Sequence, residues 1–246
     1  MPLRIMALYL RSAWIWGVSA VLFLVWIPVM AVIRLSDRDP LALRTGRSLR
    51  LLGRTLVRAQ APEFHISGLE HIQPGQNYLM VSNHQSFIDI PLISFIPLDM
   101  KCMARSNLFR IPWAGWALRM SKEISIERKD PRNAARALLQ GVKFLRGGCS
   151  VLIFAEGTRS PDGAMLAFSE GPFQLAIRAG VPVLPLVIDG TGRNLGKNAA
   201  LFSVREPIYL RILPPVPVEG FGTKQAGEVR DLVWEMMAAE LARLRK

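Results

Sequence analysis

Cysteine and histidine are both scarce in this chain, which has two cysteines and three histidines among 246 residues. Cys102 and Cys149 form no CxxC pair and have no histidine-rich neighbourhood, which argues against a zinc site and for a reduced, cytoplasm-facing compartment. The sequence also lacks internal repeats, low-complexity tracts and a GxSxG nucleophile elbow. Without that elbow or clustered metal ligands, a hydrolase of thioesters or phosphoesters is disfavoured.

Charge is missing from one long stretch, Ala13 to Ile33, "AWIWGVSAVLFLVWIPVMAVI". A bilayer span needs about 20 apolar residues, so the length is sufficient. A buried core helix of this length without a charge is unusual, and a cleaved signal peptide would be shorter. Pro28 predicts a kink. A true span and a bent helix lying in one leaflet therefore both stay open.

Positive charge is concentrated at the start of the chain. The formal net charge is +12, and nine arginines against two aspartates precede Ala61. On a helix of about 100° per residue, one sector holds only arginines and another mainly leucines. The first comprises Arg44, Arg47, Arg50, Arg54 and Arg58, and the second Leu41, Leu49, Leu52 and Leu56.

A basic amphipathic helix that follows an apolar one is typical of an element lying on an anionic membrane. An ordinary surface helix is the alternative. A nucleic-acid partner is not expected, because no aromatic residues alternate with these arginines. Arginines crowd the downstream flank of the apolar run more than the upstream flank, which holds Arg4 and Arg11. The positive-inside tendency therefore predicts the inner (cytoplasmic) membrane, with the catalytic domain facing the cytoplasm.

Beyond Pro62, short apolar runs alternate with helical patterns, which predicts an α/β domain with a mostly parallel sheet covered by helices. We expect residues 1–61 to form a membrane-binding two-helix element and residues 62–246 to form the α/β domain. Strands are expected at "FHIS", "YLMVS", "KCMA", "ISIE", "VLIF", "VLPLVI" and "IYLRIL". Helices are expected at "SFIDIPLISF", "PWAGWALRM", "PRNAARALLQGVKFL", "GPFQLAIRAG" and "EVRDLVWEMMAAELARLRK". Ligands of such sheets lie beyond the carboxyl ends of the strands.

One polar cluster at a predicted strand end is "NHQSFID". An aspartate five positions after a histidine can hold one imidazole nitrogen protonated, so that the other nitrogen accepts a proton. His84 could then deprotonate a substrate hydroxyl directly, with Asp89 as its orienting partner. The alternative is a structural histidine that caps the helix expected to start near Ser86.

Cations and a permissive turn lie at the ends of three more predicted strands. In "FAEGTRS", Gly157 lets the backbone approach a ligand, and Arg159 suits bidentate binding of a phosphate. Arg128 in "ISIERKDPRN" and Arg105 in "MARSNLFRIP" add further positive charge. Read singly, these stretches also fit a plain turn and a solvated charge run. Together with His84, they predict a phosphate-bearing substrate beside a general base.

These stretches resemble, in order, four sequence blocks of the glycerophospholipid acyltransferase family, and specifically of its bacterial 1-acyl-glycerol-3-phosphate acyltransferases. The resemblance covers roughly Gly68 to Val218. It implies His84 as catalytic base and Asp89 as its orienter. It implies that "ISIER" binds the acceptor phosphate through Arg128, and that "VPVLPLVI" shapes the acyl site. It also implies that glycerol phosphate is bound by Glu156, Gly157, Thr158 and Arg159.

The chain departs from the family pattern at three positions. Ala155 stands where a proline usually precedes the glutamate, and Arg105 stands where many members have lysine. Glu170 in "EGPF" replaces a residue of a lysine-containing block, which would weaken the positive field near the phosphate.

The resemblance implies transfer of an acyl group from acyl-CoA or acyl-carrier protein to the 2-hydroxyl of a membrane-borne lysophosphatidic acid. It implies no metal and no bound cofactor. The same chemistry on another lysolipid, such as a lyso-ornithine lipid, is an alternative, and a non-catalytic membrane-binding module is another. Pro28 and the family resemblance together favour a helix embedded in one leaflet over a true span.

Overall fold

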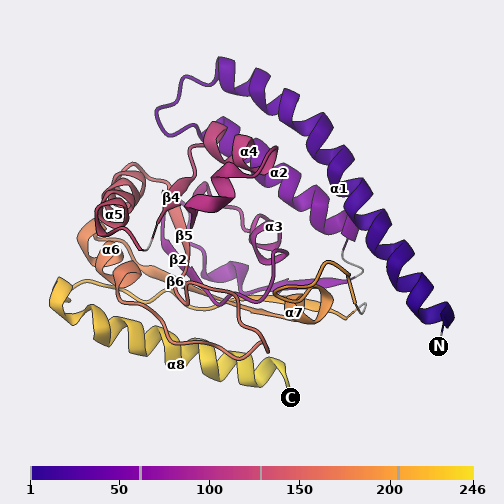
Figure 1. Ribbon diagram of the computed structural model, residues 1–246. Coiled ribbons are helices and arrows are strands. Elements are labelled where there is room, and N and C mark those ends of the chain that lie inside the picture. The colour runs from indigo at the N-terminus through magenta and orange to yellow at the C-terminus, as the bar shows by residue number, and fades with distance from the viewer. Residues whose placement is uncertain (1, 61–62, 128, 204–205) are drawn as a thin grey trace.

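A seven-stranded sheet forms the centre of the computed structural model, which describes residues 2–60, 63–127, 129–203 and 206–246 (Figure 1). The strands are β1 (Phe64–Ser67), β2 (Leu79–Ser82), β3 (Met100–Arg105), β4 (Ile124–Ile126), β5 (Ser150–Phe154), β6 (Val183–Asp189) and β7 (Ile208–Ile212). Their order across the sheet is β1-β7-β6-β2-β5-β3-β4. The pairs from β6 to β4 are all parallel, whereas β7 runs antiparallel to β6 and carries β1 parallel to itself. The predicted mostly parallel sheet is confirmed.

The helices cover both faces of this sheet. They are α1 (Pro2–Ser36), α2 (Leu43–Gln60), α3 (Asp89–Ile93), α4 (Ala114–Met120), α5 (Pro131–Arg146), α6 (Gly171–Ala179), α7 (Thr191–Asn194) and α8 (Ala226–Leu244), with 3₁₀ turns η1 (Leu69–His71), η2 (Ser106–Arg110) and η3 (Thr223–Gln225). Every strand and helix expected from the sequence is present, and the short α7 was not predicted. The helix expected from Ser86 begins at Asp89.

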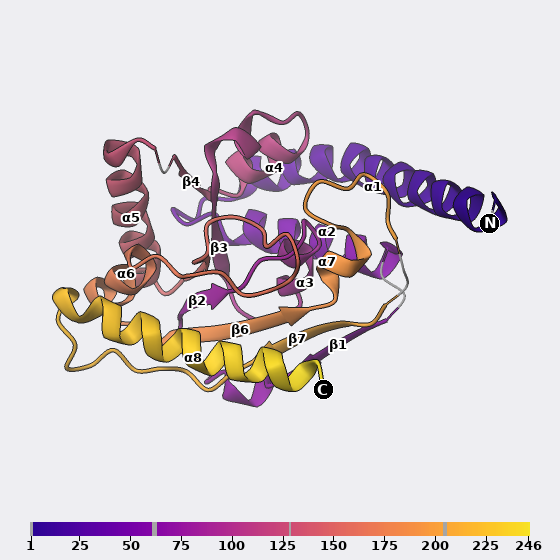
Figure 2. The same cartoon turned by 60° about the horizontal axis from the view of Figure 1, so that its bottom comes forward.

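Alternating side chains on each strand build two cores, one on each face of the sheet. Val151 and Ile153 of β5 pack with α5, α6 and α8, whereas Leu152 and Phe154 pack on the opposite face, where α2 and α3 lie. Figure 2 shows α5, α6 and α8 on the opposite side of the sheet from α1 and α2. Because both faces are covered, the strands are apolar throughout and not only at every second position.

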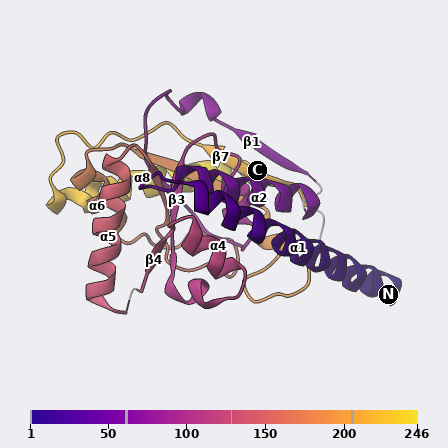
Figure 3. The same ribbon diagram turned by 90° about the horizontal axis from the view of Figure 1, so that it is seen from above.

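The apolar helix α1 lies along α2 and against the α/β domain. In the first half of α1, Nε1 of Trp16 donates to the carbonyl of Ala200 at 2.7 Å. In the second half, Nε1 of Trp26 donates to the carbonyl of Ser48 in α2 at 3.0 Å. Met30 is fully buried, and the helix continues through Pro28. The first turns extend past the body of the domain (Figure 3). Its outward side carries exposed apolar residues, among them Tyr9, Leu10, Trp14, Val21, Leu24, Val25, Val29, Val32 and Leu35.

The arginine sector of α2 packs on the domain, which differs from the sequence-based expectation. Arg50 is buried and donates to the carbonyl of Met100 at 2.8 Å and to Asp99 at 2.9 Å. Arg47 forms a two-point ion pair with the same carboxylate, at 2.9 and 2.6 Å, and lowers the pKa of Asp99 by hydrogen bonding to it. Arg54 donates to the carbonyl of Ser94. The prediction that this sector as a whole faces anionic headgroups is therefore wrong, since it fastens α2 to the domain.

Candidate active site

The candidate site lies at the carboxyl edge of β2, β5 and β3, as expected for a parallel sheet. β2 pairs with β5 in register from Leu79–Val151 to Ser82–Phe154, and β5 pairs with β3. The chain leaves β2 toward His84 and leaves β5 toward Glu156, so these residues come from adjacent strand exits. Arg105 is the last residue of β3.

His84 and Asp89 form a close pair inside the turn between β2 and α3. Nδ1 of His84 lies 2.7 Å from Oδ2 of Asp89, and the same oxygen accepts the backbone N–H groups of Gln85 at 2.7 Å and Ser86 at 2.9 Å. Asp89 is fully buried, and these three donors hold its carboxylate in place. Because a carboxylate only accepts hydrogen bonds, Nδ1 carries the proton and Nε2 is left as the acceptor. The pair is therefore arranged for proton abstraction.

The imidazole of His84 is held between two loops and one aromatic ring. It stacks on Phe154 with the ring centroids 3.9 Å apart and an interplanar angle of 20°, and 15% of its side chain is exposed. Its backbone N–H donates to Oε1 of Glu156 at 3.1 Å, and its carbonyl accepts from the backbone N–H of Ser160 at 2.7 Å. The β2 and β5 exit loops are thereby joined, which fixes the histidine relative to the glycine turn.

Two guanidinium groups lie together on this turn. Arg105 donates to the carbonyl of Gly157 at 2.5 Å, and Gly157 has a φ of 76°, which a side chain would strain. Burial lowers the pKa of Arg159, and Arg105 lowers it further while Asp89 opposes this. Nη1 of Arg159 is buried and meets no hydrogen-bond partner within the described part of the chain. A half-buried guanidinium with a spare donor suits an anionic ligand such as a phosphate.

Glu156 has a different character from the arginines. Burial raises its pKa to about 8, although the backbone N–H groups of His84 and Leu166 lower it in part. Its Oε2 is buried and has no partner among the residues described by the structure. Ala155, which precedes it in place of the usual proline, belongs to the core. Glu156 thus joins two loops through its other oxygen and is predominantly protonated near neutral pH.

The structure brings together His84, Asp89, Arg105, Glu156, Gly157 and Arg159, and places Thr158 half-buried in the same turn. Arg128 lies outside the described residues. Glu170, expected to weaken the positive field at the phosphate, forms an ion pair with Arg230 of α8 at 3.0 Å. Its charge is therefore balanced locally.

An apolar cavity of about 400 Å³ begins next to this cluster. Phe87 lines the cavity, and Cζ of Arg159 lies 4.0 Å from the centroid of the same ring. The cavity runs between α1, α2, α3, α4 and the sheet, and its few polar lining residues include Arg50 and Glu123. Burial raises the pKa of the Glu123 carboxyl. Lining residues from the N-terminal helices include Trp16, Phe23, Leu49, Leu52 and Leu56.

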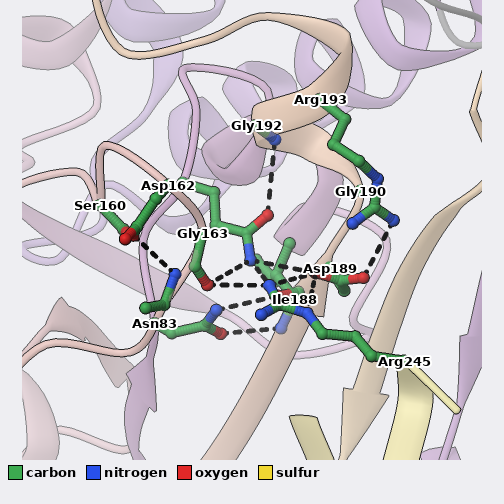
Figure 4. A network of polar contacts seen from close by, with 12 residues as sticks. Asn83, Ser160, Asp162, Gly163, Ile188, Asp189, Gly190, Gly192, Arg193 and Arg245 are labelled. Atoms are coloured by element: carbon green, nitrogen blue, oxygen red, sulfur yellow. Dashed lines mark hydrogen bonds and ion pairs between the residues drawn. The ribbon is translucent and has the colours of Figure 1, made fainter. Parts of the chain in front are cut away.

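A second polar network lies behind the histidine turn, and the sequence reasoning missed it (Figure 4). Nε2 of the buried Gln85 donates to the carbonyl of Ile188 at 3.0 Å and lies 3.3 Å from Asp189. Asp189 accepts from Arg245, at 2.7 and 3.0 Å, and from Arg193 at 3.0 Å. Arg245 also donates to the carbonyl of Gly163 at 2.8 Å. The last turn of the chain is thus tied to the turn that carries His84.

In the same network, the Asn83 side chain pairs in both directions with the backbone of Ile188, at 2.8 Å each way. No local signal existed for this contact, because Ile188 lies 105 residues beyond Asn83. The contacts of Gln85 and Arg245 left no local signal, since their partners lie about a hundred and about fifty residues away, respectively.

Residues 63–189 match the family model described as "Acyltransferase". The chain belongs to this acyltransferase family. The chain is 38% identical over 129 residues to a chloroplastic 1-acyl-sn-glycerol-3-phosphate acyltransferase of Brassica napus, covering 52% of the chain and 38% of that relative. It is 30% identical over 220 residues to the human enzyme named 1-acyl-sn-glycerol-3-phosphate acyltransferase alpha, covering 86% of the chain and 76% of the relative.

The acyltransferase fold extends over nearly the whole chain. The crystal structure of the 1-acyl-sn-glycerophosphate (LPA) acyltransferase PlsC from Thermotoga maritima matches with a TM-score of 0.83 and 27% identity, covering 98% of both chains. The family resemblance inferred from the sequence is therefore confirmed. The chain spans well under half the length of the chloroplastic relative. Within the described residues, no group of three or more histidine, cysteine, aspartate or glutamate side chains could hold a metal ion, and the expected absence of a cofactor stays a prediction.

Proposed function

We propose that this protein transfers a fatty acyl group from the thioester of acyl-CoA or acyl-carrier protein to the 2-hydroxyl of 1-acyl-glycerol-3-phosphate, giving phosphatidic acid. The proposal rests on three groups that lie next to one another. His84 is oriented by the buried carboxylate of Asp89, and Arg159 has a guanidinium nitrogen with no hydrogen-bond partner. Phe87 contacts that guanidinium and also lines the apolar cavity. The relatives are named as 1-acyl-sn-glycerol-3-phosphate acyltransferases, which supports this acceptor.

In the proposed reaction, Nε2 of His84 takes the proton of the acceptor hydroxyl while the oxygen attacks the thioester carbonyl. Asp89 stabilises the resulting imidazolium through the Nδ1 hydrogen bond, without becoming protonated itself. The tetrahedral intermediate then expels the thiolate, which takes the proton back from Nε2. The products are an ester and a free thiol, and no acyl group becomes attached to the protein.

The anion site orients the acceptor for this step. We assign its phosphate to Arg159 and Arg105, with Arg128 as a further predicted partner, and the turn at Glu156, Gly157 and Thr158 to the glycerol phosphate. A phosphate held by charge-assisted hydrogen bonds fixes the hydroxyl near His84, which is catalysis by positioning. The apolar cavity is assigned to the acyl chain that is transferred, because its lining is apolar and includes Phe87, which Arg159 also contacts.

The membrane is proposed to contact α1. This helix is long and apolar enough to cross a bilayer, from Ile5 to Ser36. However, Trp16 bonds α1 to the domain, and Trp26 bonds it to α2, which Arg50 fastens to the domain. Crossing would therefore draw the domain into the hydrocarbon. A helix embedded in one leaflet of the inner membrane, with the catalytic domain in the cytoplasm, reconciles both observations.

The proposal is tested with purified full-length protein in detergent, offered lysophosphatidic acid and acyl-CoA or acyl-carrier protein thioesters of several lengths, with the products identified by mass. Phosphatidic acid should form, and His84→Ala should reduce its formation at least about a hundredfold, since general-base catalysis contributes that much or more. Lyso-ornithine lipid in parallel reactions addresses the alternative acceptor. Retention of more than about a tenth of the turnover by His84→Ala would contradict the general-base mechanism.

A further inference from the structure

The loop and helix after β3 expose large apolar side chains beside a cluster of cations. Ile111, Trp113 and Trp116 are 46%, 42% and 45% exposed, respectively. From Ser106 to Lys122 the sequence holds three basic residues and no acidic one, and Arg110 and Arg119 of this stretch are exposed. Aromatic side chains flanked by arginines match the chemistry of a membrane interface, where an indole ring places its apolar body toward the acyl chains.

The two indole rings are held in a defined arrangement. Trp113 and Trp116 contact edge to face, with centroids 5.1 Å apart and an interplanar angle of 61°. Trp113 adopts a φ of 65°, an uncommon backbone conformation for a bulky residue, directly before α4. On the opposite side of α4, Ala117 is buried and Gly115 lies so close to the backbone of Phe109 that a side chain there would collide with it. The inner side of the element is therefore packed, while the indoles are left outside.

This exposed surface adjoins the apolar helix α1. Ala117 shares a core cluster with Ile27 and Met30 of α1, and Figures 1 and 2 place α4 beside α1 on the side of the molecule away from α8. Α1 is the one described helix that is apolar and long enough for a bilayer. The same short segment also borders the cavity, since Ile111, Ala114 and Leu118 line it.

We propose that residues 110–119 form a second membrane contact, which inserts Ile111, Trp113 and Trp116 into the headgroup and upper acyl region of the leaflet that holds α1. Arg110 and Arg119 then lie at the level of anionic headgroups. The occupant is lipid and not a protein partner, because the surface continues a helix of bilayer length and residues 110–119 carry two arginines and no carboxylate. This inference extends the proposed membrane association of α1 and places the cavity wall at the leaflet surface.

The first test measures the depth of residue 116 directly. Full-length Trp116→Cys is labelled with an environment-sensitive fluorophore, which leaves the buried Cys102 and Cys149 unmodified under native conditions. Leu232→Cys on α8, exposed to the same 45%, is the matched control. In vesicles containing phosphatidylglycerol, the label at 116 should shift to the blue and be quenched by lipids that carry a nitroxide near the headgroup. The label at 232 should show neither effect.

An aqueous spectrum at 116 in vesicle-bound protein would overturn the proposal. So would a blue shift that appears without lipid as protein concentration rises, because that would indicate self-association through this surface. Neither outcome depends on acyl transfer, so failure of the proposed activity is recognised separately.

The second test is kinetic. The double variant Trp113→Ser/Trp116→Ser should raise the apparent KM for a vesicle-borne acceptor about tenfold and leave the KM for a dispersed short-chain acceptor unchanged. Leu232→Ser should change neither. An equal rise in the apparent KM for both acceptors would indicate that the tryptophans support folding or the cavity wall. That result would contradict a membrane contact.

Discussion

The guanidinium of Arg159 lies over one face of the Phe87 ring, with its Cζ 4.0 Å from the ring centroid. Phe87 also lines the apolar cavity, so a single aromatic side chain separates the cationic region from the apolar one. In the proposed complex, the polar head of the acceptor and the transferred acyl chain meet at this ring, within reach of His84.

Arg159→Lys is expected to lower kcat/KM for lysophosphatidic acid about tenfold to a hundredfold. Lysine keeps the charge but loses the planar fork that binds phosphate at two points and stacks on Phe87. The KM for the acyl donor should stay within about threefold, because the donor does not use this contact. Initial rates with each substrate varied in turn provide the measurement. An unchanged kcat/KM would show that Arg159 does not bind the phosphate at two points.

Asp89→Asn is expected to preserve the fold and to reduce turnover by about a hundredfold or more. The asparagine oxygen can still accept the N–H groups of Gln85 and Ser86, but the imidazole loses the charge that selects its tautomer. Turnover and the near-ultraviolet circular dichroism spectrum are measured on the same samples. Wild-type turnover with a native spectrum would show that His84 needs no orienting carboxylate.

Glu156→Gln should remove a pH dependence of stability. The folded pKa of Glu156, about 8, lies above its ordinary value of 4.5, so the folded state binds the proton more tightly than the unfolded state does. The stabilisation from this group is fully present below about pH 4.5 and is lost as the pH rises through about 8. The Tm of Glu156→Gln relative to the wild type should therefore increase from pH 5 to pH 9. A constant difference in Tm over this range would contradict the raised pKa.

Arg245→Gln should lower kcat about tenfold with little change in either KM. It removes the ion pair that holds Asp189 next to Gln85, and the backbone N–H of Gln85 is one of the donors that position Asp89. Arg243→Gln is the matched control, because Arg243 lies two residues away and pairs with Glu240 at the surface. Arg245→Lys should restore part of kcat. If Arg245→Gln and Arg243→Gln had the same kcat, the network would have no role in positioning Asp89 for catalysis.

Ala104→Leu is expected to shorten the preferred acyl chain. Ala104 is buried and lines the cavity, so the larger side chain would occupy space that we assign to the chain. Competition among acyl-CoA thioesters of different lengths, read by mass, should show the shift. Ala104→Ser, of similar volume, should keep the wild-type distribution. If both variants preferred the same acyl-chain length, the acyl chain would not occupy this cavity.

The order of elements and the composition of the site could be predicted because both depend on short-range patterns. Short apolar runs mark the strands and helical patterns mark the helices. Asp130 caps α5 by accepting the N–H groups of Arg132 and Asn133. His84 and Asp89 lie five residues apart, within one turn of chain. The parallel sheet then brings the other strand exits to the same edge.

The contacts that depend on tertiary packing could not be predicted. Helical periodicity correctly placed Arg47, Arg50 and Arg54 on one sector, but it cannot tell whether that sector meets headgroups or Asp99, which lies 49 residues beyond Arg50. The same limit applies to Glu170, whose partner Arg230 is 60 residues away. Sequence spacing gives the face of an element, whereas the partner of that face is set by the whole fold.

The wall of the cavity is built in part from the N-terminal helices, through Trp16, Phe23, Leu49, Leu52 and Leu56. Removing residues 1–60 would therefore open the cavity as well as remove the proposed membrane contact of α1. In a chimaera that received these residues from a relative with another acyl preference, the spectrum of fatty acids in the product should change even though every residue around His84 stayed the same. Residues 1–60 would then determine both the attachment to the bilayer and the selection of the fatty acid.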